Sequence, residues 1–378
     1  MSFADTPASS APGILGSMSD HAFCDVLIIG GGIAGLSLAS ALAEHADVVL
    51  LEAEPTLAHH TSARSAQQLV PGYGPPPVRE LTRATLAALA ALPDARRLVW
   101  PSRFMVVGRA ADVQAHRTEA METITHAEAC ALVPALLPEA FESAALDTTS
   151  VRTDATALIE HHRALAAARG ARILTGHRVD AAEKHDPGWL VSAGKTTIRA
   201  ARVVNAAGAW ADRVAALFGA EPLGLVPLRR TAAYVDVARP LPPETPMVSS
   251  ADNTWYFRPE GQRVLVSPSE AVPSEPCDAQ PVPREVDAVV AKVDSVTTLG
   301  ITGVQRAWTG LRTEAPDGVP VVGFDPAVED FFWLAGQGGF GFQTSSGIAA
   351  LAVGLLEGVR PKGSAETLAA LDPGRFRT

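Results

Sequence analysis

The chain has 378 residues, of which 47% are hydrophobic and 19% charged, enough for two or three domains around a sizeable core. Its net charge of −10, without a run of Lys and Arg, argues against nucleic acid or an anionic membrane as a partner. No apolar stretch reaches the length of a transmembrane segment.

Residues 1–22 are rich in Ala, Ser and Pro. They lack the basic start and apolar core of a secretory signal, so we expect a disordered extension outside the fold. The three cysteines, Cys24, Cys130 and Cys277, lie far apart in the sequence. This usage predicts reduced thiols and a cytoplasmic protein.

Two adjacent histidine pairs, His59-His60 and His161-His162, show no metal-binding spacing with Cys or acidic residues. Neighbouring side chains on a helix or strand point in different directions, so neither pair should converge on one site. We therefore expect solvated or structural histidines and no metal ion.

The first motif is a βαβ unit with a glycine-rich turn. An apolar strand over 24–29 precedes Gly30-Gly31-Gly32-Ile33-Ala34-Gly35, a helix follows, and a second apolar strand ends at Glu52. Gly30 permits the tight turn, Gly32 lets a pyrophosphate approach the backbone, and Gly35 allows close helix packing. The helix start favours the anion, and Glu52 can accept hydrogen bonds from a ribose. The unit predicts dinucleotide binding rather than an ordinary glycine-rich turn.

A polar, irregular stretch over 59–68 follows the second strand, on the side where doubly wound sheets bind ligands. Its Arg64 and Ser65 can meet a phosphate or cofactor, whereas the plain alternative is a solvated loop. Tyr73 stands between glycines and prolines. A helix is expected from about residue 77 to 92.

The character of the chain changes near residue 98, where we expect an excursion into a second domain. Residue 154 is a plausible cap for a strong helix that ends at Gly170. Further elements are expected as a strand over 103–108, two short helices over 111–132, a strand over 141–146, and a meander over 176–184, 188–193 and 195–200.

A short apolar strand then breaks at Asn205-Ala206-Ala207-Gly208-Ala209-Trp210, where the backbone can approach a ligand closely. Residues 223–305 read as β structure with a helix over 284–297. After a strand over 331–335, a second glycine-rich turn over 336–341 opens onto a helix that extends to residue 357. The positive end of such a helix can stabilise the charge of a reduced flavin.

From about residue 25 to 347 the chain resembles the D-amino acid oxidase / glycine oxidase family of FAD-dependent enzymes, and within it the bacterial D-arginine dehydrogenases. The resemblance rests on several motifs in the family's order: the turn over 30–35, Arg64-Ser65-Ala66, Tyr73-Gly74, the stretch over 205–210, Arg229-Arg230, Trp255-Tyr256, Gly310-Leu311-Arg312 and Gln337-Gly338-Gly339-Phe340-Gly341.

The resemblance implies an α/β fold with a discontinuous, glutathione-reductase-like Rossmann domain that binds FAD non-covalently. A second domain, an antiparallel β-sheet with helices, would form the roof over the flavin. The expected boundaries are 23–94, 147–222 and 306–370 for the FAD domain and 95–146 and 223–305 for the substrate domain.

The resemblance also implies which residues hold FAD, with Val179 meeting the adenine through its backbone from a strand after Gly176. The expected FAD-binding residues are Gly30, Gly32, Ile33, Ala34, Gly35, Glu52, Arg64, Ser65, Ala66, Val179, Ala207, Gly208, Trp210, Gly310, Arg312, Gly338, Gly339, Phe340, Gly341, Gln343 and Thr344.

The substrate residues that match the family are Tyr73, Arg230, Tyr256, Arg312 and the backbone near Gly339. The carboxylate of an amino acid suits a bidentate arginine, and Arg312 is the best candidate. Arg229 and Arg230 would face opposite sides of a strand, so only one should reach the pocket, and the match favours Arg230.

Two positions depart from D-arginine dehydrogenase. Phe104 stands where that enzyme has the acid for the guanidinium end, and Gln68 stands in place of a histidine. A cationic side chain facing Phe104 and Met247 would be unpaired, so D-arginine is expected to be a poor substrate.

The expected reaction is oxidative deamination of a neutral or apolar D-amino acid by hydride transfer to flavin, with oxygen or a quinone as electron acceptor. Two alternatives stay open: an oxidase of secondary amines on the same fold, and a nicotinamide dehydrogenase or nucleotide-binding protein.

Overall fold

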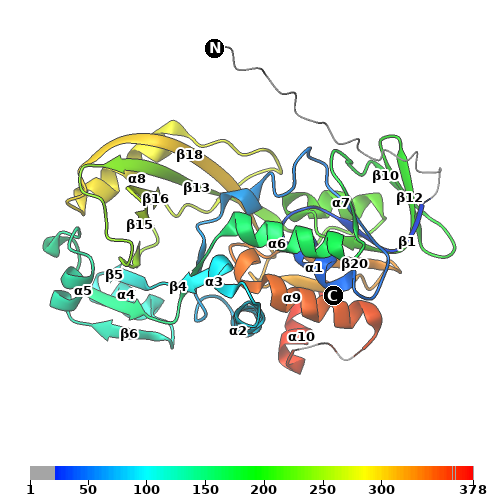
Figure 1. The fold of residues 1–378 in the computed structure, drawn as a ribbon, viewed down its shortest axis with the longest axis horizontal. Coiled ribbons are helices and arrows are strands. Elements are labelled where there is room, and N and C mark those ends of the chain that lie inside the picture. The colour runs from blue at the N-terminus through cyan, green and yellow to red at the C-terminus, as the bar shows by residue number, and fades with distance from the viewer. Residues whose placement is uncertain (1–21, 360, 362, 378) are drawn as a thin grey trace, which may run out of the picture.

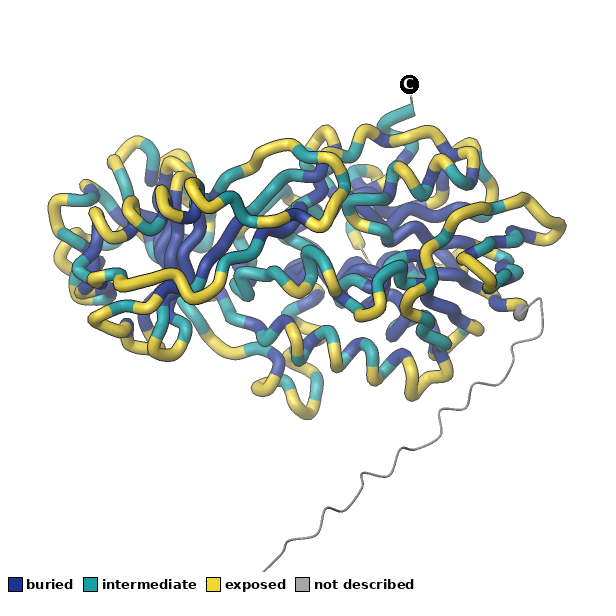
Figure 2. Tube along the Cα trace, turned by 90° about the horizontal axis from the view of Figure 1, so that it is seen from above, coloured by how far each residue is buried: buried dark blue, intermediate teal, exposed yellow. Residues whose placement is uncertain are grey.

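The computed structural model describes residues 22–359, 361 and 363–377, so the extension expected over 1–22 lies outside the described residues except for Ala22. The described part contains two large sheets and a small one, with the first large sheet on the right of Figure 1 and the second on the left. Figure 2 shows buried strands within both halves.

The first large sheet is built on parallel strands. Strands β9, β2, β1, β12 and β20 run parallel to one another, with β19 antiparallel at one edge and the β10–β11 hairpin against β12. Their bounds are β1 Ala22–Ile29, β2 Val48–Leu51, β9 Arg172–Leu174, β10 Ala181–Lys184, β11 Trp189–Ala193, β12 Thr196–Asn205, β19 Val321–Phe324 and β20 Phe331–Ala335.

Helices cover this sheet because its strands are apolar on both faces. One apolar core lies between the sheet and helices α1, α6 and α9, and another lies on the other face under α7. The helices are α1 Ile33–Leu42, α2 Pro76–Ala90, α6 Ala155–Ala168, α7 Ala211–Leu217, α9 Gly341–Glu357 and α10 Ala365–Leu371. Helix α6 begins at the expected cap, since the Asp154 carboxylate accepts from the Ala157 N–H.

The second large sheet carries the order β17-β13-β16-β15-β14-β5-β7-β6, with β18 on the other side of β13. It is antiparallel except where β14 pairs with β5. Its strands are β5 Phe104–Gly108, β6 Met121–Ile124, β7 Ser143–Asp147, β13 Val226–Val237, β14 Met247–Ser250, β15 Tyr256–Glu260, β16 Arg263–Ser267, β17 Val272–Pro273 and β18 Ile301–Glu314.

Strand β18 corrects one expected boundary. It pairs with β13 over its whole length, so residues 306–314, assigned from the sequence to the cofactor domain, belong to the second sheet. Helices α4 Ala110–His116, α5 His126–Leu132 and α8 Pro283–Ser295 accompany this sheet. Strand β6 separates α4 from α5, which the sequence had presented as two helices alone.

Between the large sheets lies a three-stranded sheet of β3 Gln68–Leu69, β8 Val151–Thr153 and β4 Val99–Pro101. The three cysteines are free, as expected. None of the helices over the described residues combines the length and apolar character that a bilayer crossing needs.

Candidate active site

A cavity lies where the carboxyl ends of β1, β2, β12 and β20 meet the second sheet. Its volume is about 1020 Å³ when the adjoining open solvent is included. The wall is formed by segments far apart in sequence: 32–34, 61–62, 64–68, 206, 208–209, 230, 232, 256, 310–313, 336–339 and 341–342.

The first glycine turn is glycine-rich because neighbouring backbone leaves no room for side chains. Gly30 has a φ of +114°, and a Cβ on it would lie 2.4 Å from the Ala206 carbonyl oxygen. A Cβ on Gly35 would lie 2.0 Å from the Gly30 carbonyl oxygen. These contacts let β1, β12 and α1 meet at one point and expose the start of α1 to the cavity.

The start of α1 is suited to an anion. Ala34 and Gly35 are in the first turn, where N–H groups have no acceptor within the helix, and Ala34 lines the cavity. The Ile33 N–H donates to Ser62 Oγ at 3.0 Å. The Glu52 carboxylate is held beside this turn, since it accepts from the Gly31 N–H at 2.7 Å and from the Glu54 N–H at 2.8 Å.

Arg64 lines the cavity, but its guanidinium is engaged by the protein. It donates to the Thr309 carbonyl at 2.5 Å and the Ala279 carbonyl at 3.0 Å, and it pairs with Asp278 at 2.5 Å. The contact with a phosphate that the sequence suggested for Arg64 therefore has no support in this geometry. The side chain instead ties the 3-10 helix η1, Thr61–Arg64, to the second sheet.

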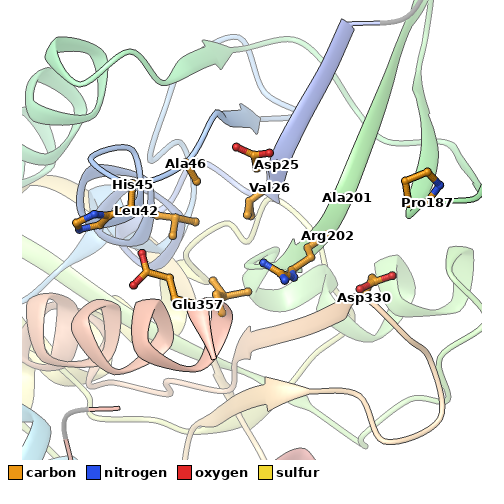
Figure 3. Close-up of a pocket in the computed structure, with 11 residues that line it drawn as sticks. Asp25, Val26, Leu42, His45, Ala46, Pro187, Ala201, Arg202, Asp330 and Glu357 are labelled. Carbon is orange, nitrogen blue, oxygen red and sulfur yellow. The ribbon is translucent and has the colours of Figure 1, made fainter. Parts of the chain in front are cut away.

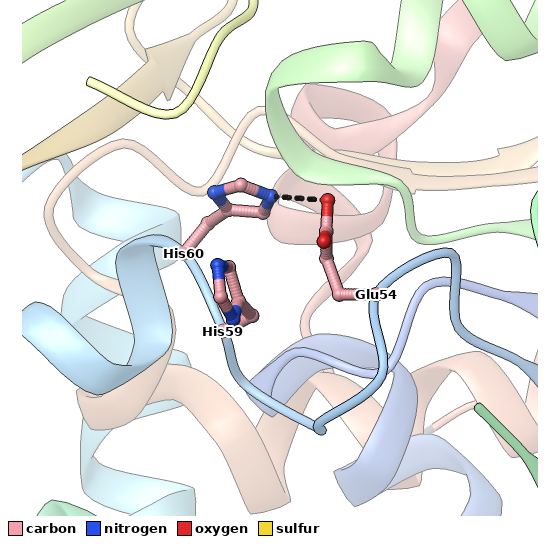
Figure 4. A group of neighbouring side chains, drawn as sticks. All are labelled: Glu54, His59 and His60. Atoms are coloured by element: carbon pink, nitrogen blue, oxygen red, sulfur yellow. Dashed lines mark hydrogen bonds and ion pairs between the residues drawn. The ribbon is translucent and has the colours of Figure 1, made fainter. Parts of the chain in front are cut away.

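His59 and His60 do approach one site, contrary to the sequence-based expectation. Both lie in a turn rather than on a helix or strand, and their nitrogens lie within 4.8 Å of the Glu54 carboxylate (Figure 4). The His60 Nε2 lies 3.1 Å from Glu54, and its ring lies 4.6 Å from that of Trp210. None of these three residues lies on the wall of the cavity.

The second glycine turn brings the start of α9 to the same cavity. Gly338 donates its N–H to the Thr313 carbonyl at 2.8 Å and has a φ of +53°. A Cβ on Gly341 would lie 3.3 Å from Ile33 Cγ2, so the two helix starts are close neighbours. Thr313 is a residue of the cavity wall, and its Oγ1 is buried without a hydrogen-bond partner among the described residues.

These features fit an elongated, anionic cofactor such as FAD. The cavity offers two helix starts and turns without side chains.

Two arginines lie on the cavity wall near the second turn. Arg230 and Arg312 are on the paired strands β13 and β18, where Arg230 faces Gly310 and Arg312 faces Leu228. The Arg312 guanidinium lies against Gly339, on which a Cβ would be 3.1 Å from Arg312 Cζ and Nη1. Among the described residues Arg312 has neither a hydrogen bond nor an ion pair.

Arg230 donates from Nε to the Glu270 carbonyl at 2.7 Å, and it too pairs with no carboxylate in the described chain. Burial and then the neighbouring Arg312 lower the pKa of Arg230 to about 10, against the attraction of Tyr256 and Glu270. Two arginines that form no ion pair with a described residue therefore lie near the buried Tyr256, an arrangement that suits a carboxylate.

Sequence reasoning missed Glu270, which lies beside this pair. Both of its carboxylate oxygens are buried without a hydrogen-bond partner, and burial raises its pKa. It also missed Arg258, which is fully buried on the strand of Tyr256. A single acid or arginine in a β segment carries no pattern that would have identified either residue.

Several expected residues lie away from the cavity wall. Tyr73 is 42% exposed, with its ring 6.0 Å from that of Phe340. Gln343 is buried and donates to the Tyr73 carbonyl at 3.3 Å, and Thr344 Oγ1 donates to the Phe340 carbonyl at 2.9 Å. Val179 lies in a loop before β10, not on the expected strand.

The site residues expected from the sequence fall into two groups, those on the cavity wall and those away from it. On the wall are Gly32, Ile33, Ala34, Arg64, Ser65, Ala66, Gln68, Gly208, Arg230, Tyr256, Gly310, Arg312, Gly338, Gly339 and Gly341. Behind or beside it are Gly30, Gly35, Glu52, Tyr73, Phe104, Val179, Ala207, Trp210, Met247, Phe340, Gln343 and Thr344.

A second hollow lies at the opposite ends of α1 and α9 (Figure 3). Charged groups surround it, among them Asp25, Arg202 and Glu357. Because it lies at the helix ends remote from both glycine turns, we assign it no part in the reaction.

Known proteins resemble this chain in sequence and in fold. The family model "FAD dependent oxidoreductase" matches residues 25–355. Mouse mitochondrial dimethylglycine dehydrogenase is 26% identical over 212 residues, 50% of this chain and 24% of the relative. The chain thus aligns with about a quarter of that curated relative's length.

Solved structures share the fold over nearly the whole chain. Glycine oxidase from Geobacillus kaustophilus has a TM-score of 0.82 at 22% identity, covering 94% of this chain and 99% of that one. L-proline dehydrogenase from P. horikoshii has a TM-score of 0.82 at 19% identity, covering 94% and 98%. The expected fold and FAD are confirmed, which sets aside the nicotinamide alternative. The chain belongs to the DAO family of FAD-dependent oxidoreductases.

Proposed function

We propose that the enzyme oxidises the Cα–N bond of an amino acid with a neutral or apolar side chain, in the D configuration that the sequence resemblance implies. The observation that supports this most directly is the pair Arg230 and Arg312, two half-buried cations on the wall of the cofactor cavity that form no ion pair with a described residue. A substrate carboxylate supplies the missing charge.

When bound, FAD would supply the two-electron oxidant that takes a hydride from the substrate Cα. The part of the protein is to bind and orient. Arg312 and Arg230 hold the carboxylate, and the buried Tyr256 closes the site from β15, so that Cα is fixed for the transfer. The imino acid that results is hydrolysed by water to a 2-oxo acid and ammonia.

The expected preference for an apolar side chain is supported by the cluster beside Tyr256. Ala232 and Tyr256 line the cavity, and Phe104 and Met247 pack with them in one buried apolar group away from the wall. A guanidinium or ammonium end placed against these side chains would lose its water without gaining a partner, which is costly. D-Arginine and D-lysine should therefore be poor substrates.

The second candidate is oxidation of an N-substituted amino acid, with the carboxylate bound in the same way. It is favoured by the names of two similar proteins, dimethylglycine dehydrogenase and L-proline dehydrogenase, whose substrates carry substituted nitrogens. An apolar pocket tolerates an N-methyl group or a ring because no polar contact is lost.

The test is anaerobic reduction of the bound flavin, followed at its visible absorption. The panel contains D-Ala, D-Leu, D-Phe, L-Leu, D-Arg, D-Lys, N-methylglycine and L-proline. Fastest bleaching by a neutral D-amino acid supports the first candidate, and fastest bleaching by N-methylglycine or L-proline supports the second. D-Arg or D-Lys far above the others would refute the pocket argument. Adding air or a soluble quinone then identifies the acceptor, oxygen or quinone.

A further inference from the structure

Arg258 is a fully buried cation that the proposed reaction does not use. It lies on β15 two residues after Tyr256, so both side chains point to the same face of the second sheet. The side chain between them, Phe257, belongs to the apolar cluster of the opposite face. Arg258 therefore extends toward the cofactor domain, beside the substrate clamp.

The guanidinium of Arg258 ends on the loop that lines the cavity. Its Nε donates to the Ala66 carbonyl at 2.9 Å, and its Nη2 lies 3.5 Å from Gln67 Oε1. Both residues belong to the cavity wall, and Gln67 has a φ of +63°. The Gln67 carbonyl is fixed as well, since it accepts the Thr153 N–H at 3.0 Å.

Glu260 holds Arg258 in this position and is shared with a second arginine, Arg152. The Arg258 Nη1 pairs with Glu260, and Arg152 pairs with the same carboxylate at 2.9 Å. Burial raises the pKa of Glu260, but the two guanidinium groups outweigh it, and the pKa lies below its ordinary value. One carboxylate thus faces two guanidinium groups, and Arg258 is fixed by Glu260 as well as by the Ala66 carbonyl.

We propose that Arg258 is a positioning residue that sets the distance between the flavin-lining loop Ser65–Gln68 and the strand carrying Tyr256. The inference rests on the proposed function, because its effect is on the alignment of substrate and flavin. Arg258 acts on substrate and flavin indirectly. It contacts Ala66 on the cofactor side, and it is joined to Tyr256 on the substrate side through the backbone of β15. A displacement of about 1 Å at such a junction can lower a rate by about 100-fold.

The test is the variant Arg258→Lys. Lysine keeps the charge for Glu260 but lacks the fixed fork that reaches Glu260 and Ala66 together. We expect FAD to stay bound, the visible spectrum of the flavin to shift, and anaerobic flavin reduction by the best substrate to slow by at least about tenfold. KM should change less than the reduction rate, because Arg230 and Arg312 are untouched.

The matched control is Arg263→Lys on the neighbouring strand β16. Its guanidinium contacts the exposed Gln305 and is remote from the cavity wall. This variant should keep the wild-type rate and spectrum. Loss of thermal stability in Arg258→Lys with an unchanged rate and spectrum would show a merely structural role and overturn the proposal.

Should Arg258→Lys fail to fold, Gln67→Asn tests the same junction from the loop. Asparagine tolerates a positive φ but is too short to reach Arg258, so a smaller fall in rate, about threefold, is expected. An unchanged rate in that variant refutes the proposal. Should no amine reduce the wild-type flavin, the proposed function fails, and the spectrum of oxidised flavin in the variants still decides the role of Arg258.

Discussion

Replacing Arg312 by Leu should weaken the binding of the substrate carboxylate without lowering the stability of the protein. Among the described residues the Arg312 guanidinium has no hydrogen bond and no ion pair, so its removal leaves no protein group unsatisfied. Its charge also disfavours the neighbouring Arg230 cation, whose pKa is lowered in part by Arg312. The thermal midpoint of the variant should therefore equal or slightly exceed that of the wild type.

The catalytic loss should be large. A carboxylate held by two charge-assisted hydrogen bonds gains about 1.5–3 kcal/mol from each, so removing both costs about 3–6 kcal/mol. At about 1.4 kcal/mol per factor of ten, kcat/KM should fall by about 10²–10⁴-fold. Flavin content should not change, because the glycine turns remain.

The assay is steady-state kinetics with the best substrate of the panel, normalised to bound flavin, together with thermal unfolding. Arg306→Leu is the matched control, since Arg306 lies on the same strand at its exposed end. Its turnover should equal that of the wild type. Near-normal turnover of Arg312→Leu would refute the clamp, and a large loss of stability would refute the claim that this guanidinium has no structural partner.

Three further outcomes are expected. In Gly339→Ala the new methyl would lie 3.1 Å from Arg312 Cζ, so the guanidinium must shift by a few tenths of an ångström. KM should then rise by about threefold to tenfold with flavin content unchanged, and an unchanged KM would contradict this. In Gly35→Ala the methyl would lie 2.0 Å from the Gly30 carbonyl oxygen, which the turn cannot accommodate. The purified protein should therefore lose most of its flavin absorbance relative to its protein absorbance. Full occupancy by flavin would show that the turn is not required for binding. Burial lowers the pKa of His162 to about 3. Because the pKa of His162 is lower in the folded state, the unfolded chain takes up the imidazole proton first as pH falls below 6.5. The free energy of unfolding therefore decreases below pH 6.5, by up to about 1.4 kcal/mol per pH unit. His162→Gln should reduce the fall in thermal midpoint between pH 6.5 and 4, and identical pH profiles would exclude His162 as a source.

The parts that the sequence predicted are those specified locally. The βαβ unit and its glycines follow from residues within one 30-residue stretch, and Gly30 and Gly35 are the positions where backbone approaches backbone. Helix α6 was placed correctly for the same reason, because its cap Asp154 and its end near Gly170 lie within the segment itself.

The parts that it missed depend on contacts between distant segments. Arg64 looked free for a phosphate because its partners, Asp278 and Thr309, are more than 200 residues away. The histidine pair at 59–60 was judged by helix and strand geometry, but it lies in a turn. Val179 was expected on a strand by position alone, yet β10 begins at Ala181. Whether the expected residues act as assigned stays a prediction until the variants are measured.

The composition of the cavity wall has a consequence for biosynthesis. Its first residue, Gly32, leaves the ribosome early, whereas Gly341 and Phe342 at the start of α9 follow some 300 residues later. The cavity wall is therefore incomplete until the start of α9 has been synthesised. A ligand that binds only the folded state adds about 2.7 kcal/mol at a concentration 100 times its Kd. Riboflavin supply should consequently govern how much full-length protein survives proteolysis, with little influence on chains truncated before α9.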